Sequence, residues 1–163
     1  MFKTGHLGVS LIVFGPVGYA LVARGAPELA AITGFVMVWF TMLPDIDHRL
    51  PILEHRGPTH SLAFAAVVGG VGWGVGMALE TVTGPAAGMS LSTVGFGIGV
   101  LTVVGHLIGD TLTPAGVPYL WPLSTRTFSL SLVGAGNPVA NSGLFGLGLL
   151  TTAGWVSVAL GVV

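Results

Sequence analysis

Five long stretches of this chain carry almost no charge, and they restrict its fold more than any other feature. They cover residues 6–23, 28–44, 59–79, 91–112 and 142–162. A helix of about 20 mostly apolar residues crosses the hydrocarbon core of a bilayer, and these stretches have that length. We therefore predict an all-α membrane bundle of about five transmembrane helices, in a single domain that covers residues 1–163.

The composition agrees with a membrane protein and excludes several kinds of site. Hydrophobic residues make up 52% of the chain and charged residues 7%, far from the usage of soluble domains. The net charge of -1 gives no reason to expect a nucleic-acid partner. The chain has no cysteine, which excludes disulfides, thiolate metal sites and thiol nucleophiles. The first apolar stretch could instead be a signal peptide, although it is long for one and begins with His6.

Glycines four residues apart recur in the third and fourth stretches. The pairs are Gly70 with Gly74, Gly72 with Gly76, Gly95 with Gly99, and Gly105 with Gly109. Such pairs let helix backbones approach closely in lipid. The alternative is that membrane helices simply tolerate glycine.

Histidine and aspartate side chains gather at the ends of the predicted spans. They are His6, Asp45, Asp47, His48, His55, His60, His106 and Asp110. Because five spans alternate in direction, all these ends fall on one membrane face. Ionisable groups at membrane depth are costly, so their convergence predicts a functional site.

Basic residues indicate which side of the membrane this face is on. The polar face carries Lys3, Arg49, Arg56 and Arg126, whereas the opposite face carries only Arg24. Positive charges concentrate in cytoplasmic loops. We therefore expect a multi-pass protein of the cytoplasmic (inner) membrane with the site facing the cytoplasm.

The spacing of these groups suits metal ligands, although each motif alone has another interpretation. His106 and Asp110 are four residues apart, so they share one face of a helix as two ligands or as a buried hydrogen-bonded pair. Asp45 and Asp47 either share a cation or form a solvated helix end. Imidazole and carboxylate ligands without thiolate suit Zn, Mn or Fe(II), and their number exceeds one tetrahedral site.

The segment from His55 to His60 holds two imidazoles around a Gly57-Pro58 turn. Thr59 is expected to cap the third helix. Arg56 and Arg49 either bind a substrate phosphate through paired donors or contact lipid head groups and set the topology.

Several ordered motifs resemble a known family. They are Gly5-His6, Leu43-Pro44-Asp45-Ile46-Asp47-His48, His55-Arg56-Gly57-Pro58-Thr59-His60-Ser61 and Gly105-His106 through Asp110 to Pro114 and Pro118. They look like the YdjM-like family, whose members are described as inner-membrane-associated metal-dependent hydrolases, one of them as LexA-binding. The resemblance covers roughly residues 1–125 as a core, and a loop and last helix follow at 126–163. The family is distantly similar to zinc-dependent phospholipase C and P1-type nucleases, which implies a helical multi-zinc site that hydrolyses phosphodiesters.

The resemblance implies a role for each polar residue. The implied metal ligands are His6, Asp45, Asp47, His55, His60, His106 and Asp110, with His48 the weakest candidate. Asp45 or Asp47 would act as the general base, and Arg56 and Arg49 would bind substrate. The expected function is hydrolysis of a phosphoester in a membrane lipid, with zinc as the first expectation and two or more ions. The alternatives are a non-catalytic metal-binding regulator that docks a cytoplasmic partner, and a small transporter, which would favour ionisable groups at mid-membrane.

Overall fold

The computed structural model describes residues 1–49 and 56–162, and these form helices and no strand. The five long helices are α1 (Lys3–Ala23), α2 (Pro27–Trp39), α3 (Leu62–Thr83), α4 (Leu91–Thr111) and α5 (Pro138–Ala159). Two short 3-10 helices, η1 (Pro44–Arg49) and η2 (Pro58–His60), lie between α2 and α3. Five segments are long and apolar enough to cross a membrane, which confirms the predicted all-α membrane bundle. The predicted ligand His55 lies outside the described residues, as does the side chain of Arg49.

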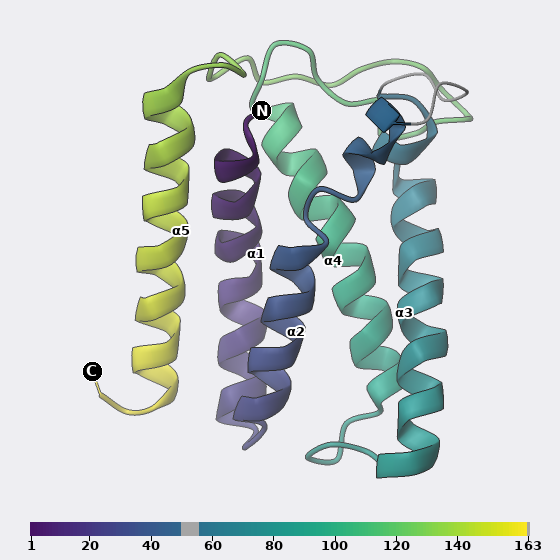
Figure 1. Cartoon of the computed structure of the whole chain (residues 1–163), viewed down its shortest axis with the longest axis vertical. Helices are drawn as coiled ribbons and strands as arrows, with labels where there is room; N and C mark the ends of the chain where they lie inside the picture. Colours follow the sequence, from purple (N-terminus) through teal and green to yellow (C-terminus); the bar gives the residue numbers. More distant parts are fainter. Residues whose placement is uncertain (50–55, 163) are drawn as a thin grey trace.

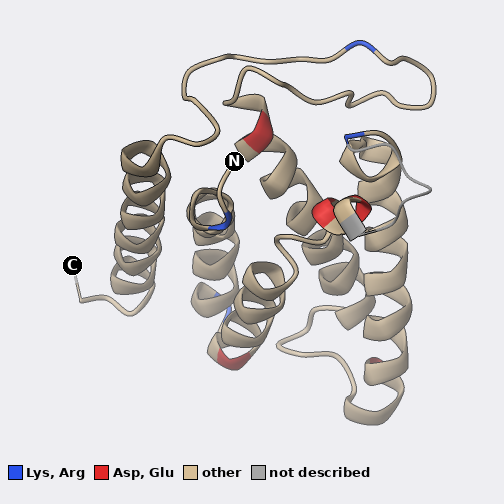
Figure 2. Ribbon diagram, turned by 45° about the horizontal axis from the view of Figure 1, so that its top comes forward, with Lys and Arg blue, Asp and Glu red and all other residues tan. Residues whose placement is uncertain are grey.

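The helices alternate in direction, so the chain has two distinct ends (Figure 1). The N-terminus, η1, η2 and the connection at 112–137 lie at one end, and the turns at 24–26 and 84–90 lie at the other. Charged segments concentrate at the first end (Figure 2). The most extensive contacts join α3 to α4 and α1 to α5, while α2 packs on α1 and, less extensively, on α4.

Local signals explain most helix boundaries, with one correction. Helix α2 begins with Pro27 and Glu28, residues that favour a helix N-terminus. Helix α3 is capped by Ser61, whose hydroxyl accepts the Phe64 N–H at 3.1 Å. The predicted cap at Thr59 is therefore wrong, because this residue is buried in η2 and donates its hydroxyl to Asp47 instead.

Glycine contacts hold α3 against α4. A Cβ atom on Gly72 or Gly95 would collide with the backbone of the other residue, and one on Gly99 would meet the Val68 backbone. These contacts confirm the predicted close packing. Gly70 and Gly74, in contrast, face open space, so that predicted pair is wrong. Gly70 and Gly74 are each two residues away from Gly72 along α3, and residues two apart on a helix do not share a face.

Most of the outer surface is apolar, as a lipid-facing surface must be. Val82 on α3 is 85% exposed and Leu150 on α5 is 73% exposed, while Met37, Val103 and Leu107 form part of a small core. Because lipid tails are as apolar as these side chains, the bundle is held together by close packing and polar contacts.

Candidate metal centre

Three separate helical segments bring four polar side chains together at the end of the bundle that carries η1 and η2. Asp45 comes from η1, His60 from η2, and His106 and Asp110 from the last turns of α4. We call these four residues the His/Asp cluster. His60, His106 and Asp110 are buried, and the Asp45 side chain is 21% exposed. The predicted convergence of histidine and aspartate on one face is confirmed.

The spacing of the four residues identifies the kind of contact they make. His60 Nε2 lies 3.3 Å and His106 Nε2 3.4 Å from the same Asp45 oxygen, Oδ1. Both nitrogens also lie 3.5 Å from Asp110 Oδ2. A charge-assisted hydrogen bond is shorter, about 2.7–2.9 Å. Ligands about 2.1 Å from a tetrahedral zinc ion are separated from one another by about 3.4 Å, which is the spacing observed.

The His106 ring is oriented so that Nε2 faces the His/Asp cluster. Its Nδ1 lies 2.9 Å from the backbone carbonyl oxygen of Thr41, which can only accept a hydrogen bond. The proton of a neutral imidazole is therefore on Nδ1, and Nε2 presents its lone pair. Nε2 is buried and has no hydrogen-bond partner among the described residues. A buried nitrogen without a partner is costly, and a cation would satisfy it.

His6 extends the cluster towards α1. Its ring stacks on His106 with centroids 3.9 Å apart, and its Nε2 lies 3.5 Å from Asp110 Oδ1. Both ring nitrogens of His6 are buried and lack a hydrogen-bond partner among the described residues. The Gly109 Cα faces this ring, where an added Cβ would lie 2.7 Å from His6 Nδ1. Of the predicted Gly105–Gly109 pair, Gly109 therefore makes room for a histidine, whereas Gly105 lies against Ser10 on α1.

Asp47 lies behind His60, on the side away from Asp45. Its Oδ2 is 3.3 Å from His60 Nδ1 and accepts hydrogen bonds from the Thr59 hydroxyl at 2.9 Å and the Arg56 N–H at 3.0 Å. A carboxylate in this place orients the imidazole of a ligand. Asp47 also belongs to a second group that could hold an ion, with Asp45 and His48.

Arg56 connects three parts of the site. Its guanidinium donates to Asp110 Oδ1 at 3.1 Å and to the Gly116 carbonyl at 3.0 Å, and its backbone N–H donates to Asp47. Its φ of 62° is uncommon for a residue with a side chain, and these contacts hold it there. The amino group of Met1 also lies 3.2 Å from Asp110 Oδ1.

Opposing effects act on the protonation of His60, which lies outside the spanning helices. Burial lowers its pKa, but the neighbouring carboxylates of Asp110 and Asp45 raise it more, so the pKa is above its ordinary value. Two carboxylates, Asp110 buried and Asp45 partly exposed, face the same imidazoles and create a strong demand for positive charge. The donor set, its burial and its spacing therefore fit a divalent cation, as the sequence predicts.

A cavity provides access to the cluster. It has a volume of about 530 Å³ and is lined at its polar side by Lys3, Asp45 and His48. Asp45 thus faces both the cluster and this cavity, which we call the head-group cavity.

Sequence reasoning missed three residues that support the site. Thr41 contributes a backbone carbonyl, for which residue type gives no signal. Thr59 precedes an apolar stretch, a position typical of a helix cap, but its hydroxyl supports Asp47. Asn141 at the start of α5 accepts the Phe2 N–H at 2.9 Å and so fixes the segment that precedes His6. Nothing in the apolar pattern of α5 indicates that contact.

Comparison with known proteins gives the family. The model of the YdjM inner membrane protein family matches residues 1–163, so the chain belongs to this family over its whole length, beyond the 1–125 core that the motifs indicate. No curated protein and no solved structure matches the chain. The family and the five candidate spans agree on an inner-membrane protein.

Proposed function

We propose that this protein is a membrane metal-dependent hydrolase that cleaves a phosphoester of a lipid at the cytoplasmic face. The observation that carries the proposal is the spacing in the His/Asp cluster, 3.3–3.5 Å between imidazole nitrogens and carboxylate oxygens. That spacing fits ligands around an ion better than direct hydrogen bonds. The orientation towards the cytoplasm follows from the basic residues of that end.

The proposed ligands of the first ion are Asp45, His60, His106 and Asp110. His6 and the second oxygen of Asp110 provide donors towards another ion, and so do Asp47 and His48. Zinc is the first choice for this donor set, and Mn or Fe(II) are alternatives. When bound, such an ion polarises a phosphoryl oxygen and makes water a better nucleophile at neutral pH.

The protein residues divide the remaining tasks. Asp45 is the carboxylate that solvent reaches, so we assign it the role of general base that accepts a proton from the attacking water. Asp47 is buried beneath hydrogen bonds and acts by orienting His60. Arg56 holds Asp110, while Lys3 supplies the positive charge that lines the head-group cavity.

One observation favours a second candidate, a metal-binding regulator without catalysis. His60, His106 and Asp110 are buried, and a closed set of four protein ligands is typical of structural zinc sites. In this case the ion would join η1, η2 and α4 and present the loops of that end to a cytoplasmic partner. The two candidates differ in whether the unaltered protein turns over a phosphoester, and the hydrolase alone predicts that Asp45→Asn abolishes this turnover.

The test combines metal analysis with a turnover assay. Protein extracted in mild detergent is analysed for Zn, Mn and Fe, and then incubated with vesicles of phosphatidylglycerol and phosphatidic acid. We expect at least one transition-metal ion per chain and release of a phosphorylated or dephosphorylated head group that stops in Asp45→Asn. Protein that contains no transition metal and takes none up would contradict both candidates. Protein that binds metal but hydrolyses no phosphoester would contradict the hydrolase and support the metal-binding regulator.

A further inference from the structure

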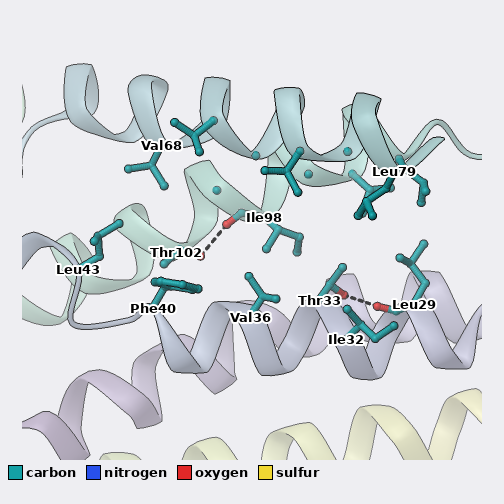
Figure 3. Close-up of a pocket in the computed structure, with 18 residues that line it drawn as sticks. Leu29, Ile32, Thr33, Val36, Phe40, Leu43, Val68, Leu79, Ile98 and Thr102 are labelled. Atoms are coloured by element: carbon teal, nitrogen blue, oxygen red, sulfur yellow. Dashed lines mark hydrogen bonds between the residues drawn. The ribbon is translucent and has the colours of Figure 1, made fainter. Parts of the chain in front are cut away.

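An apolar groove runs through the membrane part of the bundle, between α2 and α3. Its walls are formed by residues such as Ile32 and Val36 on α2 and Val71 and Val75 on α3, and its floor lies on α4 (Figure 3). The cavity volume is about 420 Å³. The groove exists because α3 contacts α4 extensively whereas α2 hardly contacts α3.

Glycine packing shapes the floor of the groove. Gly72 and Gly76 on α3 and Gly95 and Gly99 on α4 all line it, and they carry no side chain to fill the space. The same residues bring the two helices into backbone contact. A shallow channel with a smooth floor therefore lies beside α2.

The groove offers no polar contact to an occupant. Its two hydroxyl groups are used within their own helices, since Thr33 donates to the Leu29 carbonyl at 2.7 Å and Thr102 to the Ile98 carbonyl at 2.8 Å (Figure 3). One side is open to the surroundings, because Val71 is 64% exposed. In a membrane those surroundings are hydrocarbon chains.

The length of the groove suits one acyl chain. On α3 the lining extends from Val68 to Leu79, which is about 17 Å along the helix axis. One leaflet of a bilayer contributes about 15 Å, half of the hydrocarbon thickness of about 30 Å.

The groove leads towards the metal centre. Phe40 and Leu43 line both the groove and the head-group cavity, which also contains Lys3 and Asp45. The apolar groove therefore lies next to a cavity that is lined by the cationic side chain of Lys3 and the partly exposed carboxylate of Asp45. With the ion of the proposed function held beside Asp45, the order becomes apolar then cationic, which is complementary to a lipid with an anionic phosphate.

We propose that a membrane phospholipid enters sideways, with one acyl chain in the α2/α3 groove and its phosphate in the head-group cavity beside Asp45. The part of the proposal that concerns the acyl chain depends only on the groove. The placement of the phosphate rests on the proposed function and makes a phospholipid the substrate class.

Photo-cross-linking in vesicles tests whether an acyl chain occupies the groove. The full-length protein is reconstituted in phosphatidylcholine vesicles that contain phosphatidylglycerol with a diazirine on one acyl chain, and labelled peptides are identified by mass spectrometry. We expect label on the facing walls of α2 and α3, because a chain held there stays next to them. Equal labelling of the outer face of α5 would overturn the proposal, since that pattern indicates only surrounding lipid. Cross-linked dimers joined through the groove would overturn it too, in favour of a second copy.

Two variants and a matched control sharpen this test. Val75→Trp and Val36→Trp fill the groove from opposite walls, and we expect each to lower groove labelling about tenfold because the indole occupies the space of the chain. Val67→Trp places the same ring on α3 outside the groove lining, where Val67 is 63% exposed, and should leave labelling unchanged. Similar labelling of all three variants would contradict a held chain.

Metal analysis of the same samples separates the two proposals. Labelled groove walls in a protein without transition metal would support the groove and refute the proposed function. A full complement of metal with no preferential labelling of the groove would refute the groove alone.

Discussion

The two ends of the bundle treat their polar groups differently. At the end away from the cluster, Glu80 accepts a hydrogen bond from the Ser90 hydroxyl at 2.9 Å, and Arg24 donates to the Ala20 carbonyl at 3.1 Å. At the cluster end, imidazole nitrogens and carboxylate oxygens stay 3.3–3.5 Å apart. At the first end, the charged groups form hydrogen bonds with neighbouring residues. At the cluster end, the nitrogens and oxygens surround a shared position that an ion could occupy. Grouped charges alone therefore do not distinguish the two ends, whereas the spacing within the cluster is compatible with a metal ion.

The strongest test of this difference is His106→Ala. The substitution removes one of the four proposed ligands and the stacking partner of His6. We expect metal content near zero, because losing a ligand costs more than the roughly 10- to 100-fold loss typical of outer-shell changes. Elemental analysis of detergent-purified protein measures it. Unchanged metal content would remove His106 from the ligand set and weaken the contrast between the two ends.

Asp47→Asn should have the next largest effect. The amide keeps the size of the side chain and an oxygen for the Thr59 and Arg56 donors, but it removes the charge behind His60. We expect metal affinity to fall about 10- to 100-fold with unchanged stoichiometry. Calorimetric titration of metal-free protein gives both quantities. A loss of one whole ion per chain would instead make Asp47 a direct ligand in the group with Asp45 and His48.

Gly109→Ala tests whether helix packing positions the site. The new Cβ would lie 2.7 Å from His6 Nδ1, so the ring or the helix must move. We expect a loss of about 1–3 kcal/mol in stability, with weaker metal binding. Gly97→Ala on the same helix is the matched control, because its Cβ meets nothing within 4 Å. Thermal unfolding in detergent should separate the two variants, and equal midpoints would contradict this role of Gly109.

The smallest effect is expected at the opposite end, for Glu80→Gln. The amide can still accept from Ser90, so only the charge is lost, and stability should change by about 1 kcal/mol or less. Metal content should be unaffected. A decrease in bound metal would show that the two ends are coupled and would break the comparison.

Much of the architecture could be predicted from the sequence. Apolar length determines the spans, since a backbone in lipid must satisfy its own hydrogen bonds and a helix does so within one segment. The alternation of spans then brings His6, Asp45, His60, His106 and Asp110 to one end. The boundaries were less accurate: α2 ends at Trp39 and α5 begins at Pro138, against predicted limits of 44 and 142. At α5, Asn137 caps the helix and Pro138 begins it, and hydropathy does not record such local signals.

What the sequence by itself determined is which residues are available at the polar end and that they lie within a membrane bundle. Only the tertiary structure decided their roles: Asp45 in the cluster, Asp47 behind His60, and Arg56 on Asp110. It also separated α2 from α3 and so formed the apolar groove. The physical reason is one of scale. Hydropathy acts over a whole helix, but ligand geometry depends on tenths of an ångström, which are set by packing between segments far apart in the chain.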